Sequence, residues 1–367
     1  ATVTVQDNIA PLAVCQPVTV QLNSGGTATV TGTQVNNGSS DNCAIQSLGV
    51  VPNSFTCANV GNNTVTLTVT DVNGNTSTCS ATVTVQDNIA PNAVCQNSSV
   101  QLNTSGTAGL TAGQVNNGSS DNCGIQSISV LPNSFTCANV GSNTVTLTVT
   151  DVNGQSATCS ALVLVQDVTP PTAFCQSGII VSLNSGGTGS ITTSMVNNGS
   201  SDNCGIASVT ASPLNFTCAD VGNPIVVLTV TDLSNNTATC GSTITVKDNI
   251  LPTAICQNIA VQIGVGGTVT VVPAQVNNGS NDNCGIATMS LSKSIFTCAD
   301  VGSQTVVLTV TDASGNSASC SAGVTVNETT APTAVCQTTP VIAQISPAGT
   351  ATITAAQINN GSTDNCS

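Results

Sequence analysis

Cysteines recur along this chain with a period of about 80 residues. One cysteine per period lies in an Ala-(Val/Phe/Ile)-Cys-Gln motif, at spacings of 80, 80, 81 and 80 residues: Cys15, Cys95, Cys175, Cys256 and Cys336. In the first, second and fourth sets the other cysteines follow at offsets of 28, 14 and 22 residues, and in the third set the first of these offsets is 29. A fixed period of this size is typical of a linear array of similar modules, here with four cysteines each.

The cysteine period divides the chain into repeats. We expect residues 1–6 to be the last strand of a preceding repeat, 7–86 to be repeat 1, 87–166 repeat 2, 167–247 repeat 3, 248–327 repeat 4 and 328–367 an incomplete repeat 5. Only Cys336 and Cys366 remain for repeat 5. The chain is therefore expected to be a piece of a longer protein.

Within a repeat, apolar and polar residues alternate as in β-strands. Residues 144–150 alternate Thr with Val or Leu, 151–154 carry an Asn-Gly turn signal, and 157–166 return as a second strand of a hairpin. Residues 99–102 and 107–111 predict another hairpin. The pattern predicts an all-β fold: a tandem array of immunoglobulin-like β-sandwich repeats of about 80 residues, with about seven short strands and two disulfides each.

Each module has few large apolar side chains. The chain has five Phe and no Trp or Tyr, and four of the Phe are aligned, one per repeat: Phe55, Phe135, Phe216 and Phe296. Apolar burial alone would leave domains of this size marginally stable, and disulfides are the usual remedy in extracellular proteins.

Four cysteines in one module allow three pairings. Strand order favours Cys95 with Cys159, which lie on the first and last strands, and Cys123 with Cys137, which flank a strand, a turn and a return strand. Applied to each repeat, this predicts the pairs Cys15–Cys79, Cys43–Cys57, Cys95–Cys159, Cys123–Cys137, Cys175–Cys240, Cys204–Cys218, Cys256–Cys320 and Cys284–Cys298.

The aspartates fall at three recurring places: the linker, the position before Asn-Cys, and the start of the last hairpin turn. In a sandwich these places lie at one end, so Asp87, Asp121 and Asp151 should converge, with oxygens of Asn88, Asn122 and Asn153 nearby. Clustered hard oxygens are what Ca²⁺ requires. The same reasoning makes the other candidate ligands Asp7, Asp41, Asp71, Asp167, Asp202, Asp232, Asp248, Asp282 and Asp312. A second interpretation is that these residues form turns and cap strands through local backbone bonds.

Composition excludes several functions. The net charge is −14 with only two basic residues, Lys247 and Lys293, so the chain has no basic patch for nucleic acid or anionic membranes. No apolar run approaches the ~20 residues of a spanning helix. Without His, Tyr or Arg, the chain lacks the usual general bases and activated nucleophiles, and we expect no enzymatic activity. The many cysteines place it in an oxidising, extracellular space.

Three recurring motifs carry a family resemblance. Residues 87–91 (Asp-Asn-Ile-Ala-Pro), 120–124 (Ser-Asp-Asn-Cys-Gly) and 150–154 (Thr-Asp-Val-Asn-Gly), followed by Cys159, resemble the hyalin-type (HYR-like) repeats of Bacteroidetes surface proteins, above all of SprB-type gliding-motility adhesins. The resemblance implies an immunoglobulin-like fold, type IX secretion and a filament on the cell surface that grips the substratum.

These observations predict the structural stalk or spacer region of a long secreted adhesin filament at the cell surface, for surface attachment or gliding. Its partners would be other repeats of the same chain or like chains in a filament, with a surface or polysaccharide ligand bound by regions outside this window. The alternative is a self-assembling extracellular filament or sheath protein, for which the Thr-Val edge strands could provide contacts.

Overall fold

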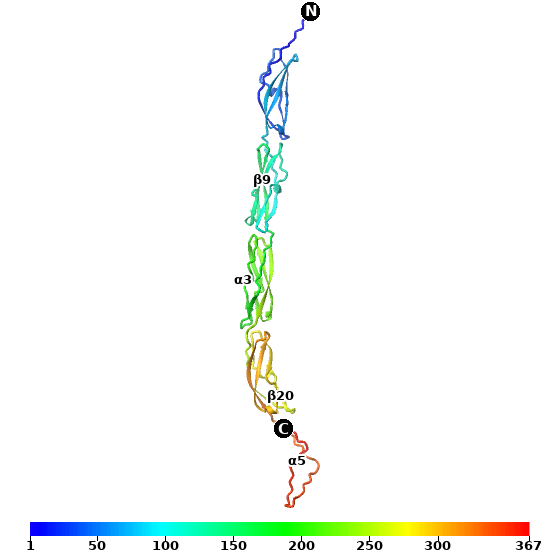
Figure 1. Ribbon diagram of the computed structural model, residues 1–367, viewed down its shortest axis with the longest axis vertical. Helices are drawn as coiled ribbons and strands as arrows, with labels where there is room; N and C mark the ends of the chain where they lie inside the picture. Colours follow the sequence, from blue (N-terminus) through cyan, green and yellow to red (C-terminus); the bar gives the residue numbers. More distant parts are fainter. Residues whose placement is uncertain (367) are drawn as a thin grey trace. The chain divides into compact units, whose positions relative to one another are not determined.

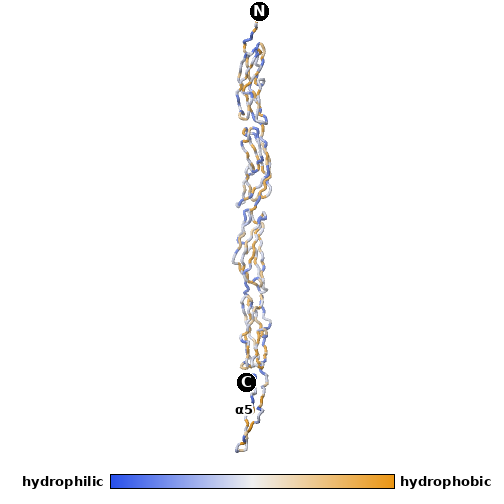
Figure 2. The backbone as a smooth tube through the Cα atoms, turned by 90° about the vertical axis from the view of Figure 1, so that its right-hand side faces the viewer, coloured by the Kyte–Doolittle hydropathy of each residue, from blue (hydrophilic) through white to orange (hydrophobic). Residues whose placement is uncertain are grey.

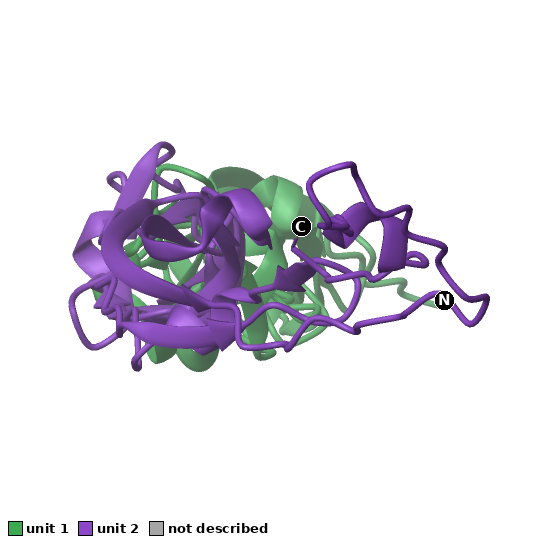
Figure 3. Ribbon diagram, turned by 90° about the horizontal axis from the view of Figure 1, so that it is seen from below, with its two compact units in different colours: residues 1–170, 202–205, 232–236 green, residues 171–201, 206–231, 237–367 purple. Residues whose placement is uncertain are grey.

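The structure is a computed structural model that describes residues 1–366, and it is an all-β tandem array of immunoglobulin-like sandwich repeats (Figure 1). Two compact units can be distinguished (Figure 3). The first consists of residues 1–170, 202–205 and 232–236, and the second holds the rest of the described chain. Each junction described below lies within one of these units.

The four complete repeats have closely similar elements. Repeat 1 contains β1 (Val18–Gln21), β2 (Thr27–Thr29), α1 (Gly32–Val35), β3 (Ile45–Val51), β4 (Ser54–Thr56), the 3-10 turn η1 (Cys57–Asn59), β5 (Gly61–Asp71) and β6 (Thr76–Gln86). Repeat 2 contains β7 (Ser98–Gln101), β8 (Thr107–Gly109), α2 (Ala112–Val115), β9 (Ile125–Leu131), β10 (Ser134–Thr136), η2 (Cys137–Asn139), β11 (Gly141–Asp151) and β12 (Ser156–Gln166).

Repeats 3 and 4 continue the same order. Repeat 3 contains β13 (Ile179–Ser182), β14 (Thr188–Ser190), α3 (Thr193–Val196), β15 (Ile206–Ser212), β16 (Asn215–Thr217), η3 (Cys218–Asp220), β17 (Ile225–Asp232) and β18 (Thr237–Lys247). Repeat 4 contains β19 (Ile259–Gln262), β20 (Thr268–Thr270), α4 (Pro273–Val276), β21 (Ile286–Leu291), β22 (Ile295–Thr297), η4 (Cys298–Asp300), β23 (Gly302–Asp312) and β24 (Ser317–Asn327). In repeat 5 the helical turn is α5 (Ala355–Ile358).

Each complete repeat has a four-stranded and a two-stranded sheet. In repeat 2 the larger sheet has the order β7-β12-β11-β9, with β7 parallel to β12 and the other pairs antiparallel. The smaller sheet pairs β8 with β10. The hairpin predicted for 144–150 and 157–166 is therefore present as β11 and β12. The hairpin predicted for 99–102 and 107–111 is wrong, because β7 and β8 pair with strands of different sheets.

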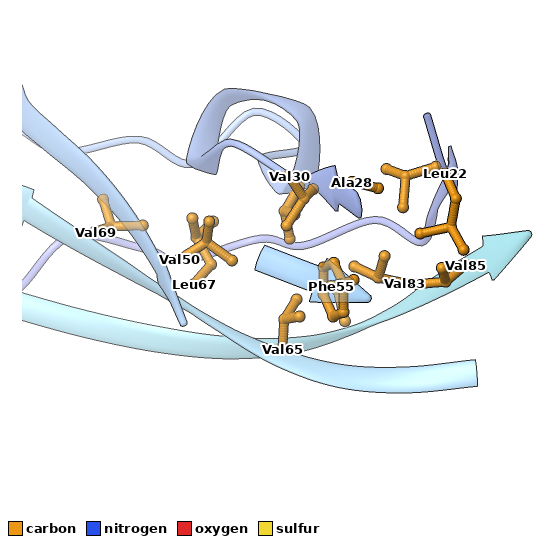
Figure 4. Packing of buried hydrophobic residues seen from close by; sticks show 13 residues of the cluster. Leu22, Ala28, Val30, Val50, Phe55, Val65, Leu67, Val69, Val83 and Val85 are labelled. Atoms are coloured by element: carbon orange, nitrogen blue, oxygen red, sulfur yellow. The ribbon is translucent and has the colours of Figure 1, made fainter. Parts of the chain in front are cut away.

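The alternating sequence places one face of each strand in the core. On β11, Val145, Leu147 and Val149 are buried while the intervening Thr residues face outward or are half-buried. Figure 2 shows the same alternation of hydrophilic and hydrophobic residues along the chain. In repeat 1 the buried Phe55 lies among the valines of the larger sheet, including Val65 and Val83 (Figure 4). One Phe and a set of aliphatic side chains thus fill each small core.

Residues 1–6, for which the sequence predicts a strand, carry no regular secondary structure, and none of the β-ladders in the described chain includes them.

Disulfides within the repeats follow the first of the two predicted patterns. Cys95 is bonded to Cys159, and the equivalent pairs are Cys15–Cys79, Cys175–Cys240 and Cys256–Cys320. They join the first segment of each repeat to its last strand. These are the pairs that strand order predicts.

The second predicted pattern is wrong, because the remaining disulfides join neighbouring repeats. The structure contains Cys57–Cys123, Cys137–Cys204, Cys218–Cys284 and Cys298–Cys366 in place of Cys43–Cys57, Cys123–Cys137, Cys204–Cys218 and Cys284–Cys298. Cys43 and Cys336 have no disulfide among the described residues.

The length of one strand explains the correction. Gly124 accepts a bond from Val152, next to the end of β11, whereas Cys137 lies just before its start at Gly141. Ten residue steps along a strand span roughly 33 Å, whereas a disulfide holds two Cα atoms within about 7 Å. Cys123 and Cys137 of one repeat therefore cannot meet, but each can reach a neighbouring repeat.

Candidate metal centre

Three aspartates converge at the beginning of each complete repeat. One carboxylate oxygen from each lies within 4.8 Å of the others in four sets, which we call triads 1 to 4: Asp7, Asp41 and Asp71; Asp87, Asp121 and Asp151; Asp167, Asp202 and Asp232; and Asp248, Asp282 and Asp312. All twelve aspartates were predicted as ligands from their recurring positions. The structure brings together the three places that the topology predicted.

Each aspartate of triad 2 uses one oxygen to hold its own loop. Asp151 Oδ1 accepts the N–H groups of Asn153 and Gln155, both at 2.8 Å, which fixes the turn between β11 and β12. Asp121 Oδ2 accepts the N–H of Cys123 at 2.8 Å. Asp87 lies directly after β6, and its Oδ1 accepts the N–H of the residue two positions on. The second interpretation, turn formation and capping, therefore accounts for one of the two oxygens of each carboxylate.

The other oxygen of each carboxylate is buried without a hydrogen-bond partner. This holds for Asp87 Oδ2, Asp121 Oδ1 and Asp151 Oδ2. Asp87 is 4 % exposed and Asp151 is 0 % exposed, so these two residues are shielded from bulk solvent. Turn formation alone does not require three unpartnered oxygens to face one another, because a loop held by one oxygen leaves the other free to point into solvent.

Asparagine oxygens extend the set. Asn122 donates through Nδ2 to Asp87 Oδ1 at 3.1 Å, and its Oδ1 is buried without a partner. Asn153 Oδ1 is also buried without a partner in the same repeat. Asn88 does not join them: it is exposed, and its Nδ2 donates to Gln21 at 2.8 Å. Two of the three predicted asparagines therefore contribute a free buried oxygen.

Triads 3 and 4 repeat this geometry with one difference. Unpartnered buried oxygens again belong to the linker aspartate, the Asp before Asn-Cys and that Asn: Asp167, Asp202 and Asn203, and Asp248, Asp282 and Asn283. The third carboxylate, however, accepts a side-chain bond from an asparagine four residues on. Asn236 donates to Asp232 Oδ2 and Asn316 to Asp312 Oδ2, each at 2.8 Å.

Triad 1 is less buried than the other triads. Burial raises the pKa of Asp71, but hydrogen bonds from Asn75 and its neighbours lower it by more, so this pKa lies below its usual range. The backbone N–H of Ile9 is the main cause that lowers the pKa of Asp7. The thiol of the exposed Cys43 is hydrogen-bonded to the Asp7 carboxylate, and this interaction raises the pKa of the thiol. The lowered pKa values of Asp7 and Asp71 favour the charged forms of these two carboxylates.

Among the residues that the structure describes, no basic side chain forms an ion pair with a triad. The ion pair found among residues 1–366 is Lys293 with Asp300, which lies outside every triad. Two unit charges at a separation of 4.8 Å repel each other by roughly 3 kcal/mol at an effective dielectric constant of ~20. Buried charges in proteins are paired or coordinate metals. A set made only of carboxylate and amide oxygens fits a hard cation, for which Ca²⁺ with its six to eight oxygen ligands is the best match.

Triads 2, 3 and 4 lie at the junctions between repeats. Asn122 Nδ2 also reaches the main-chain oxygen of Asn23 in repeat 1, at 3.5 Å, and Asn203 Nδ2 reaches that of Asn103, at 3.2 Å. The next residue in each case, Cys123 or Cys204, carries the disulfide to the preceding repeat. The candidate site therefore shares a loop with the covalent link.

Sequence reasoning missed two groups of residues. Asn203 and Asn283 were not named, although they follow an aspartate and precede a cysteine as Asn122 does. Asn75, Asn236 and Asn316 were also not named. Their signal is the spacing Asp-x-x-x-Asn at the last hairpin turn, which repeat 2 replaces with Gln155.

Comparisons with known proteins give one sequence relative. No family model matches the chain. Hyalin from Strongylocentrotus purpuratus is 32 % identical over 241 residues, which are 62 % of this chain and 20 % of hyalin. The chain thus spans about a fifth of the length of the curated relative that it matches. No helix among the described residues has the length and apolarity needed to cross a membrane.

Solved structures with similar chains include arrays of immunoglobulin domains and of cadherin domains. Sidekick-1 immunoglobulin domains 1–5 match at 11 % identity over 87 % of this chain and 81 % of that chain, with a TM-score of 0.31. Protocadherin gamma B7 cadherin domains 1–4 match at 13 % identity over 85 % and 100 %, with a TM-score of 0.29. By sequence, the chain is similar to a portion of hyalin.

Proposed function

We propose that this chain is the stalk or spacer region of a long secreted adhesin at the cell surface, and that each Asp triad binds one Ca²⁺ ion. The observation that carries the proposal is the combination of a disulfide and a triad on one loop at three successive junctions, as in Asp121 and Cys123. A binding module would need distinctive residues in one repeat, whereas the junction recurs almost unchanged. A spacer needs repeated, durable junctions.

The motif resemblance supports a more specific assignment. The linker and Asp-Asn-Cys motifs are similar to hyalin-type repeats of Bacteroidetes surface proteins, which points to a SprB-type gliding adhesin exported by type IX secretion. In this proposal the adhesive ligand, a surface or a polysaccharide, is bound by other parts of the protein. The chain itself would have no catalytic role in this proposal, because its recurring charged clusters consist of carboxylates that converge on one another at the repeat ends.

Calcium binding is tested by thermal unfolding of the full chain with disulfides intact, followed by circular dichroism, in 5 mM Ca²⁺ and in EGTA. At a free concentration of about 100 times the dissociation constant, one ion adds about 2.7 kcal/mol to the stability of the folded state. We expect a large rise in Tm with Ca²⁺ and a smaller one with Mg²⁺, which demands stricter octahedral geometry. Equal Tm values in Ca²⁺ and EGTA would contradict the proposal.

The spacer role is tested by small-angle scattering of the same protein. Strands of about eight residues rise roughly 3.3 Å per residue, so each repeat should add about 30 Å to the maximum dimension. A monomer whose dimension falls well below this value would contradict a stalk. Assembly into ordered filaments as the concentration rises would instead favour the self-assembling filament or sheath protein.

A further inference from the structure

The tripeptide Asp121-Asn122-Cys123 belongs to two structures at once. Asp121 Oδ1 faces triad 2, and Asn122 contributes a free Oδ1 and a bond to Asp87. Cys123 forms the disulfide with Cys57 of the preceding repeat. Asp121 Oδ2 accepts the N–H of Cys123 itself, at 2.8 Å. The carboxylate that faces the cation site therefore also holds the main chain of the disulfide.

The disulfide is also packed by this loop on its other side. Cys57 Sγ lies 3.4 Å from the main-chain oxygen of Asn122 and 3.7 Å from that of Gly26. Both sulfur-bearing residues are half-buried. A reductant must approach one sulfur along the S–S axis. The contact of Asn122 with Cys57 Sγ places this loop beside the bond that the reductant attacks.

We propose that cation binding at triads 2, 3 and 4 protects the adjoining disulfide between repeats from reduction, with Asn122, Asn203 and Asn283 as the positioning residues that couple the two. This inference rests on the proposed calcium site. With the ion bound, the loop is held by ligands from three segments; without it, the three carboxylates repel one another and the loop opens. Loop opening then exposes Cys57–Cys123, Cys137–Cys204 and Cys218–Cys284.

An opposing electrostatic effect is smaller. A bound cation removes negative charge beside the sulfur, which by itself favours the approach of a thiolate. The two unit charges of Ca²⁺ at 4 Å in water change a rate by roughly thirtyfold. A free ion at about 1,000 times its dissociation constant lowers the population of ion-free loop by about a thousandfold. The net effect of a bound ion is therefore slower reduction of the disulfide.

Reduction of each disulfide by a small dithiol can be measured from the thiols that it produces. One thiolate of the reagent attacks a sulfur of the cystine, the S–S bond breaks and the other cysteine leaves as a thiolate. The second thiol of the reagent then displaces the first cysteine, so the reagent becomes a cyclic disulfide and the protein gains two thiols. Alkylation and peptide mass spectrometry count these thiols at each cysteine.

The experiment uses the full chain with dithiothreitol, in Ca²⁺ and in EGTA, after Ca²⁺ binding has been measured by calorimetry. We expect Ca²⁺ to slow reduction of the three inter-repeat disulfides that adjoin triads, Cys57–Cys123, Cys137–Cys204 and Cys218–Cys284, by more than about tenfold. The disulfides within repeats, such as Cys95–Cys159, serve as internal controls and should change by less than about twofold. Binding without selective protection overturns this inference, whereas absence of binding overturns the proposed calcium site.

Two variants separate coupling from general destabilisation. Asp151→Asn keeps the oxygen that holds the turn and removes one triad charge, so it should abolish protection at Cys57–Cys123 and leave Cys137–Cys204 protected. Asn122→Ala should weaken protection at Cys57–Cys123, whereas Asn117→Ala, at an exposed site in the same segment, should not. Equal protection of Cys57–Cys123 in the wild-type chain, in Asp151→Asn and in Asn122→Ala would overturn the assignment.

Discussion

Gly106 lies against the disulfide between Cys137 and Cys204, so closely that a Cβ at this position would stand 2.7 Å from Cys137 Sγ. The same Cβ would lie 3.0 Å from the main-chain oxygen of Asn203 in the next repeat. Gly26 and Gly187 occupy the equivalent positions. A Cβ at either of them would lie 2.8 Å from the Sγ of Cys57 or Cys218. The turn after the first strand is thus part of each junction.

Gly106→Ala should destabilise the junction more than its backbone conformation alone explains. Gly106 has φ +71° and Gly118 has φ +78°, but nothing lies within 4 Å of a Cβ at Gly118. Both substitutions incur about 1–2 kcal/mol for a left-handed residue. Gly106→Ala should cost a further ~1–3 kcal/mol through steric overlap. Urea unfolding followed by circular dichroism measures the difference; equal losses for the two variants would refute it.

The aromatic core of a repeat should dominate its stability. Phe135 is 1 % exposed, whereas Phe174 is 51 % exposed. Phe135→Ala should therefore lose about 3–5 kcal/mol in urea unfolding. Phe174→Ala is the matched control and should change stability by less than ~0.5 kcal/mol. A comparable loss of stability in both variants would contradict the assignment of Phe135 to the core.

The effect of Asp151→Asn on stability should change sign with calcium. In EGTA the variant removes repulsion within triad 2 and should raise the Tm. In Ca²⁺ it removes a charged ligand and should lower the Tm. Asp220→Asn makes the same charge change outside the triads, at a residue that caps η3, and should show no such reversal. A shift of the same sign in both buffers would argue against a cation site.

Acid should release the ion pair of repeat 4. Lys293 is the main cause that lowers the pKa of Asp300, and the N–H of Thr297 adds to it. A carboxyl whose folded pKa lies below its unfolded value contributes stability above that unfolded value, 3.8, and loses it as pH falls through the folded pKa. Lys293→Gln should therefore reduce stability at neutral pH but not at pH 2, in thermal scans across this range. A pH-independent difference would contradict this account.

The sequence predicted much of the fold because strand alternation and turn residues are local signals. Residues 145–149 alternate strictly, and β11 buries the expected face. The convergence of Asp87, Asp121 and Asp151 also followed from local positions, since all three mark strand ends at one end of a sandwich. The orientation of their second oxygens could not be predicted, because it depends on which oxygen each loop uses.

Two features were beyond local reasoning. Residues 99–102 and 107–111 flank a tight turn, with Asn103 accepting the N–H of Thr107, yet their strands belong to different sheets. Alternation identifies a strand but not its partner. The pairing of Cys137 with Cys204 was missed because only partners within one repeat were compared. The 11-residue length of β11, which separates Cys123 from Cys137, was the signal that could have revealed it.

The two kinds of disulfide overlap along the chain. The segment closed by Cys15 and Cys79 overlaps that closed by Cys57 and Cys123, and this overlap continues through each bond to Cys366. Every peptide bond between Cys15 and Cys366 therefore lies inside at least one covalent ring. A protease that cuts the main chain once, at any of these bonds, leaves a single molecule, so in an environment rich in proteases the chain can be nicked without being severed.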